Sequence, residues 1–270
     1  MKSRLLITGG TGFIGSHLLR YLSNAGHELG VIVRAGSASA SKDAFPHGTR
    51  ICPYSGDVDS LVDALEAVRP DVVVHLASCY LAAHQPEQIT DLIQSNVLFG
   101  SHLLEAIQKT DLCCRFLNTG TSWQHYGDAD YEPVNLYAAT KQAFESIIDY
   151  YVSAHEFRAL SLKLFDTYGP ADPRRKVFHW FEVAETSPTP IPFSPGEQMM
   201  DLVYIDDIVR GFERAIAFLQ ATQTLGHERY VLSSPDRMTL RDVAKTYEQA
   251  VGRPLNMEWG GRPYRPREVM

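Results

Sequence analysis

The glycine-rich stretch TGGTGFIG, which runs from Thr8 to Gly15, constrains the fold of this chain more than any other feature. It lies between a short apolar run, Arg4–Thr8, and a segment with helical spacing of its leucines, Phe13–Gly26. Glycine permits a tight turn and a close approach of backbone to a ligand, and a helix N-terminus presents free N–H groups and a positive dipole end. This context predicts a phosphate-binding turn at Gly9, Gly12 and Gly15.

Strand-like and helix-like patterns alternate through the first 165 residues. The expected strands are Arg4–Thr8, Glu28–Arg34, one within 49–57, Asp71–Ser78, Cys114–Gly120 and Arg158–Phe165, and the further expected helices are Val58–Val68, Asn96–Gln108 and Tyr137–His155. Strands joined by helices indicate a parallel sheet with right-handed crossovers. We therefore predict an α/β fold with a Rossmann-type, doubly wound parallel sheet.

The pattern changes after Phe165. Glu185–Gln198 is rich in proline and indicates a loop, Asp201–Asp207 indicates a strand followed by a helix, and Thr239 is expected to cap a helix that ends at Gly252. We predict a dinucleotide-binding domain over 1–165, with 225–235 returning to its sheet. A smaller C-terminal α/β lobe, formed by 166–224 and 236–270, is expected to bind the substrate.

Composition and charge narrow the classes of partner. The 270-residue chain has a formal net charge of −7, which disfavours non-specific binding to nucleic acid. Its four cysteines (Cys52, Cys79, Cys113 and Cys114) lack the C-x-x-C spacing of a metal site, and neither a signal peptide pattern nor a long apolar run is visible. We expect a cytoplasmic protein with reduced cysteines that binds no metal, membrane or nucleic acid.

Two polar residues bear on the choice of dinucleotide. Arg34 ends the second strand, where an acidic residue would favour NAD and an arginine suits the 2′-phosphate of NADP. NADP is therefore the expected cofactor and NAD is less favoured, although Arg34 could also be a solvated surface residue. Asp57, after the third strand, either contacts the adenine amine or caps the helix that follows.

Of the 13 tyrosines, Tyr137 alone has a lysine four residues later, at Lys141. Positions i and i+4 share one face of a helix, so Lys141 can lie beneath Tyr137. The other notable motifs are GDV at Gly56–Val58, HLAS at His75–Ser78, Asn96, NTGTS at Asn118–Ser122, LFDTYGP at Leu164–Pro170 and DLVYIDD at Asp201–Asp207.

Together with the glycine turn, and in this order along the chain, these motifs resemble the extended short-chain dehydrogenase/reductase family, of the NAD-dependent epimerase/dehydratase type. The resemblance implies an enzyme for nucleotide-activated sugars: an epimerase, a 4,6-dehydratase or a ketoreductase. Within the family, NLYAATKQAFE and LKLFDTYGP most resemble the nucleotide-sugar 4-ketoreductases that make CDP-abequose or CDP-paratose.

The resemblance also assigns site residues and a partner. Beyond the three glycines, Arg34 and Asp57, the implied cofactor-binding residues are Thr11, Phe13, Ile14, Val58, Leu76, Ala77, Ser78, Asn96, Tyr137 and Lys141. A homodimer is expected, because the family often dimerises through helices like Asn96–Gln108 and Tyr137–His155.

The Tyr137–Lys141 pair suits ketone reduction. Hydride transfer to a ketone leaves an oxyanion that needs a proton, and a tyrosine phenol can supply it. A nearby ammonium ion is expected to lower the phenol pKa from about 10, and Lys141 can also hold the nicotinamide ribose. Thr121 is expected to hydrogen-bond the substrate oxygen, with Ser122 as the alternative.

Several positions depart from the family pattern. Ser122 and Trp123 stand where dehydratases carry an acidic pair, which disfavours dehydration. Asp166 stands where asparagine is commoner, and Met200 where an arginine often contacts the substrate diphosphate. The family resemblance places the C-terminal arginines near the sugar nucleotide, so the candidate replacements are Arg262, then Arg265, with Arg174 and Arg175 as further candidates.

The leading hypothesis is an NADPH-dependent ketoreductase acting on a nucleotide-activated 4-keto-6-deoxy sugar. A nucleotide-sugar epimerase with tightly bound cofactor is the alternative, but Arg34 weighs against it because such epimerases mostly use NAD. A catalytically silent NADP-binding module is a third hypothesis, and the intact Tyr137–Lys141 pair argues against it.

Overall fold

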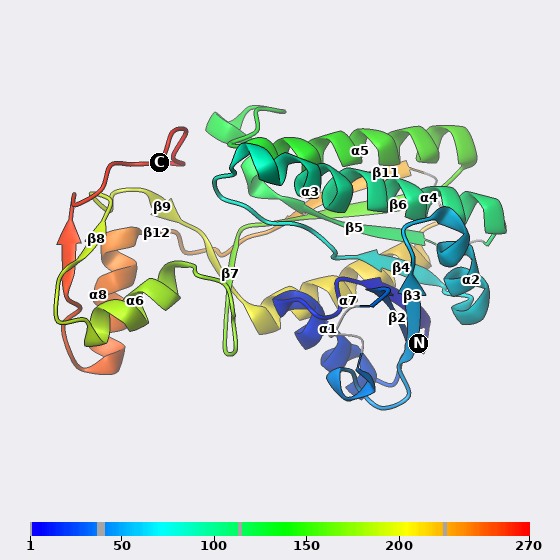
Figure 1. Cartoon of the computed structure of the whole chain (residues 1–270), viewed down its shortest axis with the longest axis horizontal. Helices are drawn as coiled ribbons and strands as arrows, with labels where there is room; N and C mark the ends of the chain where they lie inside the picture. The colour runs from blue at the N-terminus through cyan, green and yellow to red at the C-terminus, as the bar shows by residue number, and fades with distance from the viewer. Residues whose placement is uncertain (1, 37–40, 113–114, 224–225) are drawn as a thin grey trace.

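The computed structural model describes residues 2–36, 41–112, 115–223 and 226–270. Seven strands form a central sheet in the order β3-β2-β1-β4-β5-β6-β11, and every neighbouring pair is parallel (Figure 1). These strands are β1 (Arg4–Thr8), β2 (Glu28–Arg34), β3 (Arg50–Tyr54), β4 (Val72–His75), β5 (Arg115–Thr121), β6 (Arg158–Leu164) and β11 (Gly226–Leu232). The strand order reverses between β1 and β4, so the predicted Rossmann-type sheet is confirmed.

Helices cover both faces of this sheet (Figure 1). One face packs on α1 (Phe13–Asn24) and α7 (Ile205–Ala221), and the other on α2 (Val58–Val68), α4 (Phe99–Thr110) and α5 (Leu136–His155). Between β4 and α4 the chain forms the short helix α3 (Ile89–Ile93) and the π-helical turn η4 (Gln94–Leu98). The β4 sequence VVVH is buried throughout, as expected for a central parallel strand.

A smaller lobe has its own apolar core. Its elements are α6 (Val177–Thr186), β8 (Ile191–Phe193), β9 (Met199–Met200), β12 (Met238–Thr239), α8 (Leu240–Val251) and β13 (Met257–Trp259). Thr239 caps α8 as predicted, since its Oγ1 accepts a hydrogen bond from the Asp242 N–H at 3.1 Å. The predicted loop Glu185–Gln198 is wrong over β8, because that strand gains a parallel partner, β13, from a distant segment.

The strand predicted over Asp201–Asp207 is too long. The structure has β10 (Leu202–Tyr204), paired with β7 (Asp166–Tyr168), and α7 begins directly at Ile205. Asp206 and Asp207 lie in the first turn of α7, where negative charge is favoured by the helix dipole.

The segments after Phe165 do not all belong to the smaller lobe. β11 pairs along its length with β6, in accordance with the expected return of 225–235 to the first sheet. Helix α7, which the sequence pattern assigns to the substrate-binding lobe, instead buries Ile208, Phe212 and Ile216 against the central sheet. Their i, i+4, i+8 spacing forms an apolar stripe that needs such a surface. The functional division of the chain into domains stays a prediction.

Three compositional expectations can be placed on the structure. Cys52 is buried and Cys79 partly buried, each as a free thiol, whereas Cys113 and Cys114 lie outside the described residues. Across the described ranges, no helix is both long and apolar enough to span a membrane. The same ranges contain no cluster of three or more His, Cys, Asp or Glu side chains arranged to hold a metal ion.

Candidate active site

The glycine turn packs so closely that side chains are excluded at Gly9 and Gly15. Gly9 has φ +71°, and a Cβ added there would lie 2.6 Å from the backbone nitrogen of Ala77. A Cβ at Gly15 would collide with the carbonyl oxygen of Gly9, while Gly12 donates its N–H to that same oxygen at 3.0 Å. The turn therefore presents bare backbone at the start of α1.

The Thr8 side chain connects the loop after β4 to the glycine turn through hydrogen bonds. Its Oγ1 accepts hydrogen bonds from the N–H groups of Leu76 and Ala77 at 3.2 and 3.1 Å, and it lies 2.9 Å from Nδ1 of His75. These contacts place the predicted residues Leu76, Ala77 and Ser78 beside the turn, at the switch point of the sheet.

Asn96 connects that loop to the helix of the catalytic candidates. Its Oδ1 accepts from Ser78 Oγ at 3.0 Å and from the Cys79 N–H at 2.7 Å. Its Nδ2 donates to the Cys79 carbonyl and to Thr140 Oγ1, both at 3.0 Å. The amide has four hydrogen-bonding positions and all are used within the protein. Any part of Asn96 in cofactor binding is therefore indirect, through the groups that it positions.

Tyr137 lies in the first turn of α5, which Asn135 caps by accepting the Ala138 N–H at 3.0 Å. The side chains of Ser78 and Thr121 interact with its phenol. Burial raises the pKa of Tyr137 to about 12, against the opposing effects of Ser78, the Arg174 charge and Thr121. The expectation of a lowered phenol pKa is therefore wrong for this structure, because desolvation outweighs the neighbouring charges and hydrogen bonds.

Lys141 is buried one turn further along α5, with 2% of its surface exposed. Desolvation lowers the pKa of its ammonium group to about 8, and the nearby Glu145 carboxylate opposes that shift. Both members of the Tyr137–Lys141 pair are therefore held away from their ordinary pKa values, as is common in catalytic sites.

Thr121 is the last residue of β5 and is 8% exposed. Its N–H donates to Gln124 Oε1 at 2.9 Å, and its Oγ1 accepts from the Trp123 N–H at 3.3 Å. Ser122 begins the 3-10 turn η5 (Ser122–Gln124). Of the two alternatives, Thr121 is the residue whose side chain interacts with the Tyr137 phenol.

The two residues that bear on cofactor choice lie at the same edge of the sheet. Arg34 is exposed at the end of β2, and its charge opposes the rise that burial causes in the pKa of the Cys79 thiol. Asp57 caps α2, which begins at Val58: its Oδ1 accepts the Ser60 N–H and its Oδ2 the Ser55 hydroxyl, both at 2.8 Å. The helix-capping alternative for Asp57 is thus confirmed, and a contact with adenine stays a prediction.

Arg174 lies close to the centre of the site. Its guanidinium group is 4.5 Å from the ring centroid of Phe13, in the glycine turn, and its charge lowers the pKa of Tyr137. It is held by an ion pair with Asp172 at 2.7 Å and by the Thr167 carbonyl at 2.9 Å. Arg174 therefore contacts the glycine turn and acts on the pKa of Tyr137.

The other candidate arginines differ in position. Arg265 has its guanidinium carbon 5.3 Å from the Trp123 ring centroid and pairs with Glu268 at 2.7 Å. Arg262 instead lies 5.8 Å from the ring of Phe193, in the core of the smaller lobe, and Arg175 is exposed. Arg174 and Arg265 thus contact aromatic residues next to the glycine turn and to Thr121, whereas Arg262 contacts the smaller lobe. Their order as substrate-binding residues stays a prediction.

Tyr80, Trp123 and Lys176 also lie at the site, although none of them is among the site residues that the sequence predicts. The Tyr80 ring lies 5.1 Å from that of Tyr137 and 5.8 Å from that of Trp123. Lys176 Nζ lies 5.3 Å from the Tyr80 ring centroid and pairs with Asp166 at 2.8 Å. That ion pair accounts for the aspartate at position 166. No local pattern marks these residues, because they meet only when three separate loops converge.

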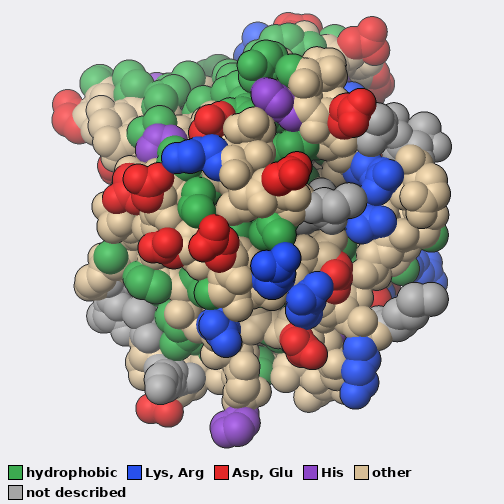
Figure 2. All heavy atoms as spheres, turned by 90° about the vertical axis from the view of Figure 1, so that its right-hand side faces the viewer, with side chains coloured by type: hydrophobic (Ala, Val, Ile, Leu, Met, Phe, Trp, Pro, Cys, Tyr) green, Lys and Arg blue, Asp and Glu red, His purple; other side chains and the backbone are tan. Residues whose placement is uncertain are grey.

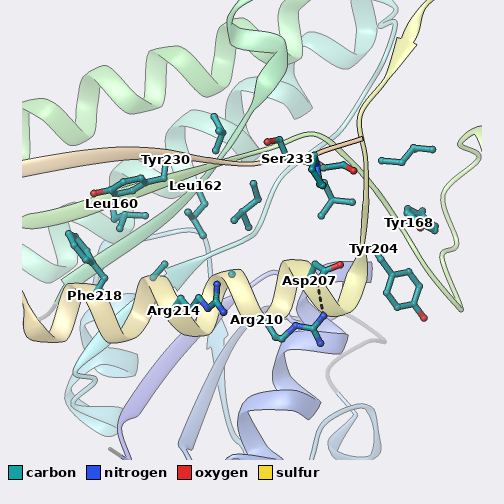
Figure 3. A pocket seen from close by; sticks show the side chains of 18 residues that line it. Leu160, Leu162, Tyr168, Tyr204, Asp207, Arg210, Arg214, Phe218, Tyr230 and Ser233 are labelled. Atoms are coloured by element: carbon teal, nitrogen blue, oxygen red, sulfur yellow. Dashed lines mark hydrogen bonds and ion pairs between the residues drawn. The ribbon is translucent and has the colours of Figure 1, made fainter. Parts of the chain in front are cut away.

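A separate cavity of about 770 Å³ lies between α7 and β11 (Figure 3). Arg210, Arg214 and Phe218 line it from α7, and Tyr230 lines it from β11. None of the predicted site residues lines this cavity, so the pair Tyr137–Lys141 belongs to a different part of the molecule.

Comparisons with known proteins agree with this architecture. A model of the NAD dependent epimerase/dehydratase family matches residues 5–231. CDP-abequose synthase from Yersinia pseudotuberculosis is 28% identical over 270 residues, covering 99% of this chain and 90% of that protein. UDP-glucose 4-epimerase from Thermus thermophilus, solved with NAD, has a TM-score of 0.79 at 24% identity, over 98% of this chain and 88% of that one. Bacillus cereus UDP-glucuronic acid 4-epimerase, solved with UDP-glucuronic acid and NAD, has a TM-score of 0.81 at 23% identity, over 100% of this chain and 88% of that one.

Proposed function

Because the chain belongs to the NAD dependent epimerase/dehydratase family, we propose that it is an NADPH-dependent ketoreductase acting on a nucleotide-activated 4-keto-6-deoxy sugar. One observation carries the proposal: Tyr137 and Lys141 lie one turn apart on α5, and the Tyr137 phenol interacts with Thr121 and Ser78, beside the glycine turn. A tyrosine phenol is protonated at neutral pH, so it can give its proton to the oxyanion that hydride transfer leaves.

The residues of the turn fit a nicotinamide dinucleotide. Gly9 and Gly15 leave no room for a Cβ, so backbone N–H groups from Gly9 to Gly15 (including Thr11, Gly12, Phe13 and Ile14) can approach a pyrophosphate at the start of α1. Leu76, Ala77 and Ser78 would line the adjoining groove, and Lys141 would hold the nicotinamide ribose. The bound cofactor supplies the hydride.

Arg34 supports NADPH as the partner. It is exposed at the end of β2, where a guanidinium group can pair with a 2′-phosphate. NAD is the second candidate, because the two solved epimerases contain NAD.

Protein groups would complete the reduction by moving one proton. Thr121 and Ser78 offer hydroxyl groups beside the Tyr137 phenol, so a carbonyl oxygen placed there can be hydrogen-bonded and then protonated by Tyr137. The Lys141 ammonium stabilises the phenolate that is left. Ser122 and Trp123 provide no acid–base pair for dehydration.

The diphosphate of a sugar nucleotide needs cationic partners. Met200 packs against the core of the smaller lobe and cannot provide one. The charges of Arg174 and Arg265 both act to lower the pKa of the Tyr80 phenol, against the rise that burial causes. We assign them as the leading phosphate-binding residues, ahead of Arg262 and Arg175. The similarity to CDP-abequose synthase supports a nucleotide-linked substrate.

An epimerase is the second candidate, favoured by the activities for which the two solved relatives are named. An epimerase first oxidises its sugar, so its tyrosine must begin as a base. Arg34 weighs against this candidate, because an arginine at the end of β2 suits NADP, whereas sugar-nucleotide epimerases mostly use NAD.

The purified protein can be mixed with NADPH and a series of nucleotide-linked 4-keto-6-deoxy sugars. We expect one NADPH to be consumed for each sugar reduced, measured by nicotinamide absorbance and by chromatography of the nucleotide sugar. An isomeric product formed without net consumption of NADPH would instead identify an epimerase. Binding without any turnover would identify a silent module.

A further inference from the structure

A fully buried carboxylate lies one helical turn beyond the catalytic candidates. Glu145 is 0% exposed and follows Lys141 by four residues on α5, so both side chains lie on the same face of the helix. A buried charge is costly unless it is paired, and an enzyme keeps one only where something depends on it or compensates it.

Two cations approach the same oxygen of Glu145. Lys163 Nζ and Arg229 Nε each lie 3.4 Å from its Oε2, and the Lys163 side chain is only 6% exposed. Within the described ranges, the other oxygen, Oε1, has no hydrogen-bond partner. It lies against Gly120, where an added Cβ would be 2.9 Å away, one residue before Thr121. The unpartnered half of the carboxylate is therefore next to the catalytic strand end.

The cations around Glu145 have further partners. Lys163 also contacts Nε2 of His125, and Arg229 forms a second ion pair with Asp149 at 2.6 Å. Asp149 in turn lies 2.8 Å from Nδ1 of His227, which comes from β11 like Arg229.

Lys141, unlike Lys163 and Arg229, has no direct ion-pair partner among the described residues. Among the described residues its ammonium group makes no direct hydrogen bond or ion pair, and the neighbouring His75 is buried and kept neutral by burial and by the Lys141 charge. The charge that favours the protonated form of Lys141 is that of Glu145.

We propose that Glu145 is a positioning residue of the catalytic site, whose carboxylate keeps Lys141 in its ammonium form beneath Tyr137. This inference rests on the function proposed above for Lys141. The competing explanation is purely structural: Glu145 would serve only to neutralise Lys163 and Arg229.

A charge-removal series separates the two explanations. The variants are Glu145→Gln, Lys163→Met and Glu145→Gln/Lys163→Met, the last of which removes both members of the buried ion pair and so protects against a failure of Glu145→Gln to fold. The primary measurement is the pH titration of the Lys141 ¹³Cε resonance in cofactor-free protein, assigned by its loss in Lys141→Met. It does not depend on enzyme activity.

We expect the Lys141 titration midpoint to lie about one pH unit lower whenever the carboxylate is removed, both in the wild-type and in the Lys163→Met background. Asp149→Asn, one turn further along α5 and half exposed, is the matched control and should leave the midpoint nearly unchanged. Equal midpoints with and without the Glu145 carboxylate in both backgrounds would overturn the proposal.

Kinetics distinguish this inference from the proposed function. If the protein reduces keto sugars, the alkaline limb of its kcat profile should move to lower pH in Glu145→Gln/Lys163→Met relative to Lys163→Met, by the same interval as the resonance. An active reductase whose alkaline limb and resonance both stay in place would refute the role of Glu145. A shifted resonance in a protein without reductase activity would support that role and refute the reductase assignment alone.

Discussion

Burial outweighs charge at both members of the Tyr137–Lys141 pair. The pKa of Tyr137 is raised to about 12 and that of Lys141 is lowered to about 8, in each case chiefly by desolvation. The four-residue spacing predicts that the two side chains share a helix face, but it carries no information on how deeply that face is buried. The sequence pattern therefore could not predict that the pKa of Tyr137 is raised.

The buried ammonium of Lys141 should reduce stability. Its folded-state pKa of about 8 is below its ordinary value of 10.5, so the unfolded chain binds more protons between these pH values and stability rises with pH across that interval. The cost is fully present below about pH 8. Lys141→Met should therefore raise the free energy of unfolding at neutral pH, by on the order of 1–3 kcal/mol, and by less near pH 10.

Thermal unfolding at neutral pH and at about pH 10 tests this expectation. Lys245→Met, at an exposed position on α8, is the control and should change stability by less than about 0.5 kcal/mol. A Lys141→Met variant that is less stable than the wild type at neutral pH would contradict this expectation. It would show that other groups offset the desolvation cost of the Lys141 ammonium group.

Arg34 should set the choice between the two dinucleotides. If it pairs with the 2′-phosphate, Arg34→Ala should weaken NADPH binding by roughly 1.5–3 kcal/mol and leave NADH binding nearly unchanged. Fluorescence titration with each cofactor measures both values. Arg50→Ala is a matched control, because Arg50 is exposed at the beginning of the adjacent strand β3, at the opposite edge of the sheet. Equal losses for both cofactors would contradict the assignment.

At the level of elements, local chemistry made several bounds predictable. β1, β2 and α2 have the bounds that the sequence indicates, because a glycine turn, a run of apolar residues and the Asp57 cap each act within a few residues. The short strand β8 was missed because its partner β13 is distant in sequence.

The site shows the same contrast between motifs that are local in sequence and contacts between distant segments. The glycine turn and the Tyr137–Lys141 pair are contiguous motifs, and the structure brings both to one edge of the sheet with Thr121. Tyr80 and Lys176 could not be found in this way, since they meet only through the folding of separate loops. The position of Arg262 could not be predicted for the same reason: its backbone N–H donates to the Phe193 carbonyl of the smaller lobe at 3.1 Å. Which arginine binds the substrate stays a prediction.

The glycine turn allows its role in folding to be separated from its role in binding. A methyl group at Gly15 would collide with the Gly9 carbonyl, so Gly15→Ala should destabilise the cofactor-free protein. A Cβ at Gly12 would lie 3.3 Å from the same oxygen, a contact that a small shift can relieve. Gly12→Ala should therefore nearly preserve thermal stability and weaken NADPH binding, because it obstructs the approach of the pyrophosphate.

Thermal unfolding without cofactor, followed by NADPH titration of both variants, makes the comparison. NADPH binding by Gly12→Ala as tight as that of the wild type, or full stability of Gly15→Ala, would contradict these roles of the two glycines.

At the scale of the whole molecule, one face offers a surface for a second copy. Figure 2, which views the molecule from the right-hand side of Figure 1, shows hydrophobic side chains gathered along the top, at the level of α4 and α5 in Figure 1. Ile93 at the end of α3, Leu98 in η4 and Tyr150 on α5 are 43%, 45% and 58% exposed. Exposed apolar groups of this size on neighbouring helices are typical of interaction surfaces. The homodimer expected from the family resemblance would form through this surface.

Light scattering coupled to size exclusion should therefore give twice the mass of one chain. Leu98→Glu/Tyr150→Glu should shift the protein toward the monomer, because each change would bury an unpaired charge at the interface. Tyr131→Glu, at a 52% exposed position between η6 (Tyr126–Asp128) and α5, is the control and should stay dimeric. A wild-type protein that is monomeric at all concentrations would contradict the proposal.

The central claim is that Tyr137 supplies the proton in an NADPH-dependent reduction, and Tyr137→Phe tests it most directly. The variant keeps the ring but removes the hydroxyl group. Single-turnover oxidation of NADPH by a nucleotide-linked 4-keto-6-deoxy sugar, measured alongside the Kd for NADPH, should show turnover slowed by about 10²–10⁴-fold with cofactor affinity unchanged. Turnover at nearly the wild-type rate in Tyr137→Phe would contradict the claim.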